Sequence, residues 1–249
     1  FFKEPVMDSQ AQQWTQTLSR YVERTIMPDG RDTFESTPLL AQTLYRLSSR
    51  KGGSLADLGC GTGKSFAPFV GQYADIVGID ADAANLAAAR QTWAGHSEIR
   101  LVEGEIGRED LPGYAADTVL TSLFLHQIPP DRLPQALKTI RRLLKPDGEW
   151  LMADELILFD AGQDAAKFDR VYRYLLEHTV PHEVYERQIK PYLLENHIYT
   201  WREMQENTPP EYRFRSLAEL EKLLAEAGLF IETVEEITPF FGCLKIKAV

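Results

Sequence analysis

One acidic residue, Asp57, lies near the end of a short apolar run, two residues before a turn that is rich in glycine. The run 55–58 predicts a buried strand, and the apolar residues within 66–70 predict a helix after the turn. Glycines at alternate positions of the turn 59–63 allow a tight bend and leave no Cβ between the backbone and a ligand. The free N–H groups of the following helix are then expected to face an anionic or polar group. This arrangement predicts a binding site at the end of the strand.

A second acid, Asp80, follows the next apolar run, 76–79, and lies about 20 residues beyond the glycine turn. This spacing is typical of the carboxylate that accepts hydrogen bonds from a ribose in a nucleoside-binding βαβ unit. An NAD-type domain is the alternative, but its fingerprint separates the last two glycines by two residues, whereas one residue separates Gly61 from Gly63. Asp57 would also repel a pyrophosphate, but it suits a cationic group such as an ammonium.

At these residues the chain resembles the class I S-adenosylmethionine-dependent methyltransferases. The segment Asp57-Leu-Gly-Cys-Gly-Thr-Gly63 matches their first motif, and Gly78-Ile-Asp80 matches their ribose motif. The resemblance implies an α/β fold, with a Rossmann-like, doubly wound, mostly parallel seven-stranded sheet whose last strand is antiparallel. It also implies S-adenosyl-L-methionine as cofactor and S-adenosyl-L-homocysteine as product.

The resemblance further implies the residues that contact the cofactor. Glu105 would bind the adenine amino group and Ile106 would pack on the ring, although a solvated acidic loop is the alternative for this segment. In the N-terminal cap Tyr21 or Arg31 would touch the ligand, but a tyrosine on an amphipathic helix is more often a core residue, which is the alternative for Tyr21. The full expected set is Asp57, Gly59, Cys60, Gly61, Gly63, Asp80, Ala81, Glu105, Ile106, Ser122, Leu123, Tyr21 and Arg31.

His126 is the candidate catalytic residue. The continuous apolar run within 117–125 predicts a strand covered on both faces, and ligands bind at the carboxyl ends of such strands. His126 lies just past this end, and a histidine can titrate near neutral pH, so it could act as a general base. A histidine that only packs or bonds within the loop is the alternative.

The chain divides into three parts by its patterns. Residues 1–50 are expected to form a helical cap, with helices over 9–27 and from Ser36 or Thr37 to about 47. Residues 51–158 and 214–249 are expected to form the cofactor-binding domain, with helices over 82–93 (capped by Asp82), 132–144 (capped by Asp131) and 216–227, and closing strands over 230–237 and 241–249.

Residues 159–213 are too many for a plain crossover, which needs about a dozen residues. They contain six of the ten tyrosines, so we expect a helical subdomain that acts as a substrate lid. The alternative for each aromatic is a place in the subdomain's own core or in a dimer contact. His178 and His182 are separated by Pro181 and have no matched third ligand, so we expect no metal site.

The composition limits the possible partners. The formal net charge of −10 argues against broad nucleic-acid binding, which needs clustered Lys and Arg, and favours a small-molecule methyl acceptor. No apolar run is long enough to span a bilayer, and two cysteines make no disulfide framework, so a cytoplasmic location is expected. A homodimer is a further possibility.

The sequence is also compatible with enzymes that use the same cofactor for other reactions. The segment 190–196 resembles the lid of the carboxy-S-adenosylmethionine synthases, but Pro191 stands where that family has a carboxylate-binding arginine. A tRNA-modifying enzyme and a cofactor-binding subunit without catalysis are the remaining alternatives.

Overall fold

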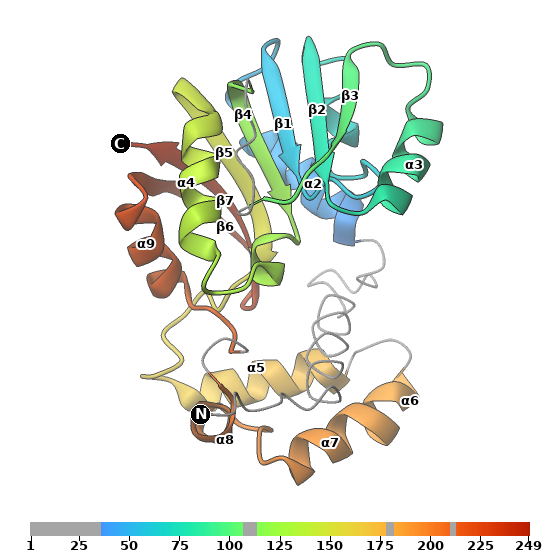
Figure 1. The fold of residues 1–249 in the computed structure, drawn as a ribbon. Coiled ribbons are helices and arrows are strands. Elements are labelled where there is room, and N and C mark those ends of the chain that lie inside the picture. The colour runs from blue at the N-terminus through green and yellow to red at the C-terminus, as the bar shows by residue number, and fades with distance from the viewer. Residues whose placement is uncertain (1–35, 107–113, 178–181, 210–212) are drawn as a thin grey trace, which may run out of the picture. The chain divides into compact units, whose positions relative to one another are not determined.

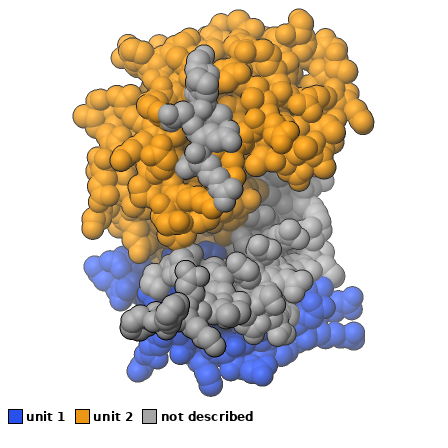
Figure 2. All heavy atoms as spheres, viewed as in Figure 1, with its two compact units in different colours: residues 1–36, 160–214 blue, residues 37–159, 215–249 orange. Residues whose placement is uncertain are grey.

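The computed structural model describes residues 36–106, 114–177, 182–209 and 213–249 (Figure 1). These residues divide between two compact units, coloured separately in Figure 2. One unit contains residues 37–159 and 215–249, and residues 160–214 belong to the other. The helix α2 (Ser36–Leu47) is grouped almost entirely with the first of these, the sheet unit.

The sheet unit is built on seven strands in the order β3-β2-β1-β4-β5-β7-β6. Strands β1 to β5 are parallel, and β7 runs antiparallel to both of its neighbours. This topology confirms the expected doubly wound α/β fold with an antiparallel last strand. The bounds are β1 (Ser54–Leu58), β2 (Asp75–Asp80), β3 (Ile99–Glu103), β4 (Ala116–Ser122), β5 (Leu144–Glu155), β6 (Leu229–Thr238) and β7 (Phe241–Ala248).

Helices cover both faces of this sheet, as Figure 1 shows. Alternate residues of each strand point to opposite faces, and they enter two separate cores. In β1, Ala56 and Leu58 belong to the core that contains residues of α4 (Leu133–Leu143) and α9 (Leu217–Glu226). Leu55 belongs to the other core, with residues of α2 and α3 (Ala83–Thr92). The buried strands are therefore apolar on both sides, as parallel strands require.

Local signals at the helix ends explain most of these boundaries. The Asp82 side chain accepts hydrogen bonds from the first turn of α3, as expected. Ser216 and Glu219 form a reciprocal capping box at the start of α9, and Gly228 follows its end with φ +72°, a conformation that favours glycine.

Two expectations about helices are wrong. Asp131 does not cap α4, because the helix begins one residue later, after Arg132. The glycine turn also does not lead into an α-helix: only the 3₁₀ turn η2 (Ala67–Phe69) forms there. Pro68 lacks a backbone donor and Gly71 adopts φ +76°, so a longer helix cannot continue through this segment.

A buried carboxylate holds the end of α2 against the sheet. Glu149 is fully buried in β5 and accepts hydrogen bonds from the backbone N–H groups of Ser49 (2.9 Å) and Arg50 (3.2 Å) and from the hydroxyl of Ser48 (2.8 Å). Lys247 Nζ lies 3.7 Å from Glu149 Oε2. These partners provide the hydrogen bonds and the charge that a buried carboxylate needs.

The second unit contains a helical subdomain between β5 and α9. Its elements are α5 (Ala165–Glu177), α6 (His182–Val184), the π-helical turn η4 (Tyr185–Ile189), α7 (Lys190–Glu195) and α8 (Trp201–Asn207). Tyr172 and Tyr185 are fully buried, whereas Tyr174 is 51% exposed. Some of the tyrosines thus form the core of the subdomain itself, which was the alternative to a substrate contact. His178 lies outside the described residues.

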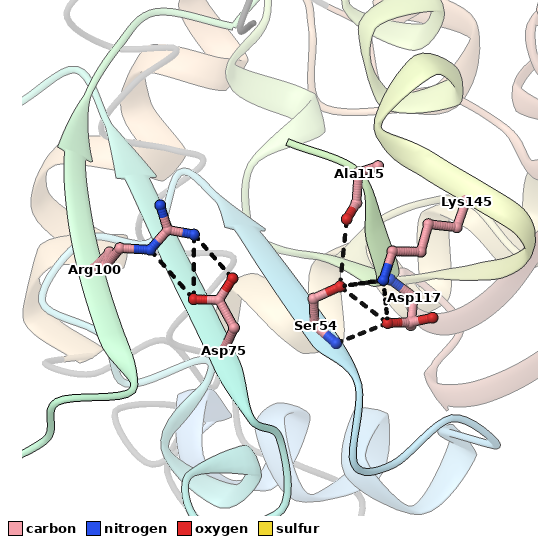
Figure 3. A network of polar contacts seen from close by, with 6 residues as sticks. All are labelled: Ser54, Asp75, Arg100, Ala115, Asp117 and Lys145. Carbon is pink, nitrogen blue, oxygen red and sulfur yellow. Dashed lines mark hydrogen bonds and ion pairs between the residues drawn. The ribbon is translucent and has the colours of Figure 1, made fainter. Parts of the chain in front are cut away.

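A polar network ties together the amino ends of β1 and β4, at the edge opposite to the predicted binding site (Figure 3). The Asp117 carboxylate accepts hydrogen bonds from the Ser54 N–H (2.8 Å) and from Lys145 Nζ (2.7 Å). The bond from Lys145, followed by the one from the Ser54 backbone, lowers the pKa of Asp117 to about 2. On the neighbouring strands Arg100 and Asp75 pair at 2.8 Å.

Because the folded-state pKa of Asp117 lies below its unfolded value of about 3.9, its contribution to stability is complete above pH 4 and disappears as the pH falls toward 2. We expect Lys145→Met to lower the free energy of unfolding by about 1 kcal/mol at pH 7, after allowance for solvent screening, and by much less at pH 2. Urea denaturation at both pH values measures the two losses in the free energy of unfolding. Lys138→Met, on the exposed side of α4, is the control. An equal loss at both pH values would contradict the assignment.

Candidate active site

The carboxyl edge of the sheet gathers polar groups from four strands. Asp57 lies near the end of β1 and Asp80 ends β2, with Leu58 opposite Ile79 in the register between them. Ser122 ends β4 and is opposite Ala153, next to Asp154 in β5. The structure therefore brings together residues that are up to 97 positions apart in the sequence (57 to 154).

Asp57 is the most unusual group of this edge. Its side chain is fully buried, and one carboxylate oxygen, Oδ2, accepts a hydrogen bond from the Ser65 hydroxyl. The other oxygen, Oδ1, is buried without a hydrogen-bond partner among the described residues. Burial raises the pKa of Asp57 to about 7; the bond from Ser65 opposes this rise, and the charge of Asp80 adds to it. A buried acceptor without a donor is costly, so this oxygen marks a place for a cationic or donating ligand group.

Three N–H groups of the glycine turn are engaged within the protein. Gly59 and Cys60 both donate to the Ile79 carbonyl (2.8 and 3.0 Å), and Gly61 donates to Asp80 Oδ2 (2.8 Å). Because no α-helix follows the turn, the expected N–H groups of an α-helix start are not formed here. The turn instead fixes the position of Asp80.

The three glycines of the turn have different surroundings. A Cβ on Gly59 would lie 2.2 Å from the ring of Phe124, and one on Gly63 would lie 2.4 Å from Trp93 Nε1. A Cβ on Gly61, at φ +53°, would meet nothing within 4 Å. Gly59 and Gly63 thus serve packing, and Gly61 borders open space. The contact between Gly59 and Phe124 also places the loop after β4 directly on the glycine turn.

Asp80 keeps acceptor capacity for a ligand. Its Oδ1 accepts the Asp82 N–H (2.8 Å) and its Oδ2 accepts the Gly61 N–H. Each carboxylate oxygen has a second lone pair. The side chain is only partly buried, so these lone pairs can accept hydrogen bonds from a diol.

The backbone after β4 is strained. Leu123 has φ 53°, which is rare for a bulky residue, and such conformations cluster at functional sites. Its N–H donates to the Ala153 carbonyl (2.8 Å) and its carbonyl accepts a bond from the Gln127 side chain (2.7 Å). The preceding Ser122 has a buried hydroxyl without a partner among the described residues. Both features belong to residues that the sequence placed at the site.

The other expected contact residues lie in varied environments. Glu105 pairs with Arg132 at 2.7 Å, which the sequence did not indicate, and Ile106 is 7% exposed within a core. The Cys60 side chain is buried, and burial raises the pKa of its thiol, so only its backbone borders the turn. Ala81 is exposed. Tyr21 and Arg31 lie outside the described residues.

His126 has a partner that the sequence analysis missed. It lies in the 3₁₀ turn η3 (Leu125–Gln127), and its Nδ1 is 2.5 Å from Oδ1 of Asp154. Asp154 is buried, and it also accepts hydrogen bonds from the N–H groups of Leu125 (2.6 Å) and Glu155 (2.9 Å). Because the carboxylate accepts at Nδ1, the pair favours the tautomer with its hydrogen on Nδ1 and its lone pair on Nε2. An acid at the end of β5, on the same edge as His126, was the available signal.

The donor set fits an amino-acid nucleoside better than a metal ion. The described part of the chain contains no group of three or more His, Cys, Asp or Glu side chains arranged to hold a metal. By contrast, Asp57 offers a buried acceptor for an ammonium group, Asp80 offers acceptors for a ribose, and Gly61 leaves space beside them.

Solved structures with a similar fold cover nearly the whole of this chain. The DhpI-SAM-HEP complex is similar over 99% of this chain and 100% of its own, with a TM-score of 0.59 and 18% identity. The PH0226 protein of Pyrococcus horikoshii OT3 is similar over 90% and 95%, with a TM-score of 0.59 and 17% identity. At these identities the likeness establishes the fold.

The sequence comparisons point to the same class. Residues 55–148 match the family described as methyltransferase domain. An uncharacterized methyltransferase of Synechocystis is 30% identical over 132 residues, which are 52% of this chain and 58% of that relative. The match thus spans less than two thirds of the relative's length. The resemblance of the glycine turn to the class I methyltransferases is confirmed.

Proposed function

We propose that this protein transfers a methyl group from S-adenosyl-L-methionine to a small-molecule acceptor and releases S-adenosyl-L-homocysteine. The observation that carries the proposal is the unpartnered, buried Oδ1 of Asp57, on the strand next to Asp80. The match of residues 55–148 to the methyltransferase domain supports it. The similar DhpI structure is named as a complex with SAM (S-adenosyl-L-methionine), which supports the same cofactor.

Each residue of the edge has a part in this proposal. Asp57 accepts hydrogen bonds from the ammonium of the methionine moiety, and Asp80 accepts them from the ribose hydroxyls. Glu105 and Ile106 hold the adenine. The cofactor supplies an electrophilic methyl group, so the protein's main task is to align the acceptor, and such positioning can contribute about 7–11 kcal/mol.

His126 acts as the general base in the proposed reaction. A hydroxyl acceptor loses its proton as the new bond forms, and a protonated amine must lose its proton before its lone pair can attack. In both cases His126 Nε2 receives the proton. Asp154 holds the ring and stabilises the imidazolium that results. General-base catalysis of this kind typically contributes about 10²–10⁴-fold.

The acceptor and the assembly are parts of the same proposal. A formal charge of −10 favours a small acceptor over nucleic acid, and a homodimer in the cytoplasm is the proposed state. No helix in the described ranges has both the length and the apolar character needed to cross a membrane.

Pro191 lies in the first turn of α7, and its side chain cannot replace a carboxylate-binding arginine, so methyl transfer is favoured over carboxy transfer.

Calorimetry with S-adenosylmethionine, S-adenosylhomocysteine and NAD tests the proposal. We expect the two sulfur nucleosides to bind with micromolar affinity and NAD to bind far more weakly. Asp80→Asn keeps the size of the side chain that Gly61 and Asp82 contact but removes its charge, and we expect it to weaken binding at least tenfold. Asp75→Asn, at the opposite end of the same strand, is the matched control. Preference for NAD, or equal binding in both variants, would refute the assignment.

A further inference from the structure

Arg173, in the middle of α5, is a cation without the partners that its helix offers. Asp169 and Glu177 lie four residues before and after it, at the spacing where ion pairs form on a helix. Asp169 instead accepts the N–H of Trp201 at 2.8 Å. Within the described ranges Arg173 has no hydrogen bond or ion pair, and its Nε is buried without a partner.

The guanidinium group is held by an aromatic ring. Arg173 Cζ lies 4.9 Å from the centroid of the Tyr199 ring. This contact stabilises the cation and removes water from one face of it. A ring face is not a conventional hydrogen-bond acceptor, and the Nε–H of Arg173 has no partner besides this contact.

Tyr199 brings a hydroxyl group to the same place. Its hydroxyl is hydrogen-bonded to that of the fully buried Tyr185. Burial, and then this bond to Tyr199, raise the pKa of Tyr185, so Tyr185 stays protonated and can donate to Tyr199. The pair contains two hydroxyl hydrogens and uses one of them, which leaves a donor on Tyr199.

A buried Nε–H and an adjacent hydroxyl are the donors that an anionic group needs. The planar fork of arginine matches the two oxygens of a carboxylate or a phosphate. The carboxylates of Glu177 and Glu186 act on the neighbouring Tyr185, but no described carboxylate forms an ion pair with Arg173, so an anionic ligand would supply the missing partner.

We infer that the helical subdomain binds the carboxylate or phosphate group of a small molecule through Arg173 and Tyr199. This anion site goes beyond the proposed function, because neither of its residues belongs to the groups proposed to bind the cofactor.

The first test is direct binding of inorganic phosphate and of acetate to the full chain. The ¹⁵N signal of Arg173 Nε–H is expected to move saturably with millimolar phosphate or acetate, and not with chloride at equal ionic strength. Arg173→Gln is expected to weaken this binding at least tenfold. Arg173→Lys keeps the charge without the fork and is expected to bind with intermediate affinity.

A matched control is available in the same subdomain. Arg202 pairs with Glu206 at 2.9 Å and its side chain is 85% exposed, so Arg202→Gln is expected to leave the phosphate affinity unchanged. If the Arg173 signal does not saturate, or if Arg173→Gln and Arg173→Lys both bind phosphate and acetate like the wild type, the site does not exist.

The second test separates this inference from the proposed function. Arg173→Gln is expected to bind S-adenosylhomocysteine normally, so a defect in phosphate binding alone cannot arise from a lost cofactor site. Equal weakening of S-adenosylhomocysteine binding and of phosphate binding in this variant would overturn the assignment of the anion to Arg173.

Discussion

S-adenosylhomocysteine is expected to bind about 100-fold more weakly at pH 5 than at pH 8, because Asp57 must be ionised to hold the ligand's ammonium. In the ligand-free protein burial raises the pKa of Asp57 to about 7. Below that pH the carboxyl is neutral, and each further unit of pH lowers the fraction of binding-competent protein about tenfold. The ammonium of the ligand stays charged throughout this range.

The same shift has a consequence for stability with a definite sign. The folded-state pKa of Asp57 lies above its unfolded value of about 3.9, so the folded protein holds the proton over the interval between them. The free energy of unfolding of the ligand-free protein is therefore expected to fall as the pH rises from about 4 to 7 on account of this group. Bound ligand reverses the trend, because its ammonium compensates the buried charge.

Calorimetry in buffers of different ionisation enthalpy measures this linkage directly. We expect release of nearly one proton per ligand bound at pH 6 and of almost none at pH 8. Asp57→Asn should bind weakly at both pH values and lose the pH dependence, while Asp117→Asn at the opposite edge should retain it. A wild-type pH dependence that persists in Asp57→Asn would assign the titration to another group.

The parts of this site that the sequence predicts are those encoded by short segments. The motif around Asp57, the strand before Asp80 and the alternating cores follow from residues that are neighbours in the chain. The expected helix after the glycine turn failed for an equally local reason, since Pro68 and Gly71 interrupt it. Periodicity in apolar residues could not outweigh that interruption.

The unpredicted parts depend on the sheet register. Asp154 meets His126 only because β4 and β5 are aligned with Ser122 opposite Ala153, and no local pattern specifies that alignment. The same holds for Glu149, whose partners lie about 100 residues earlier in the chain. The sequence likewise shows Arg173 among possible helical ion pairs and cannot show that both carboxylates remain unpaired with it.

The Asp154–His126 pair carries the largest expected effect on turnover. Replacement of Asp154 by Asn keeps the shape of the side chain but removes the carboxylate that accepts the Nδ1 hydrogen. The imidazole is then free to adopt the opposite tautomer, in which Nε2 holds the hydrogen and cannot accept a proton. We expect kcat to fall about 100-fold, within the range of general-base catalysis, with the affinity for S-adenosylhomocysteine unchanged.

Imidazole ¹⁵N shifts test the tautomer without any acceptor. In the wild type His126 is expected to show a protonated Nδ1 and an unprotonated Nε2 at pH 8, and Asp154→Asn is expected to shift this population toward the other tautomer. Asp147→Asn is the matched control, since Asp147 is exposed near the start of β5 with φ 62°, a conformation that Asn tolerates.

A double-mutant cycle separates positioning of the base from support of the loop, because Asp154 also accepts the Leu125 N–H at 2.6 Å. If Asp154 acts through His126, the change to Asn has little further effect on kcat in a His126→Ala background, and the two losses are not additive. If Asp154 only holds the loop, the losses add, and the wild-type pH profile of kcat persists in Asp154→Asn. Because these two outcomes differ by about two orders of magnitude in the double mutant, the cycle decides between an oriented base and a structural contact.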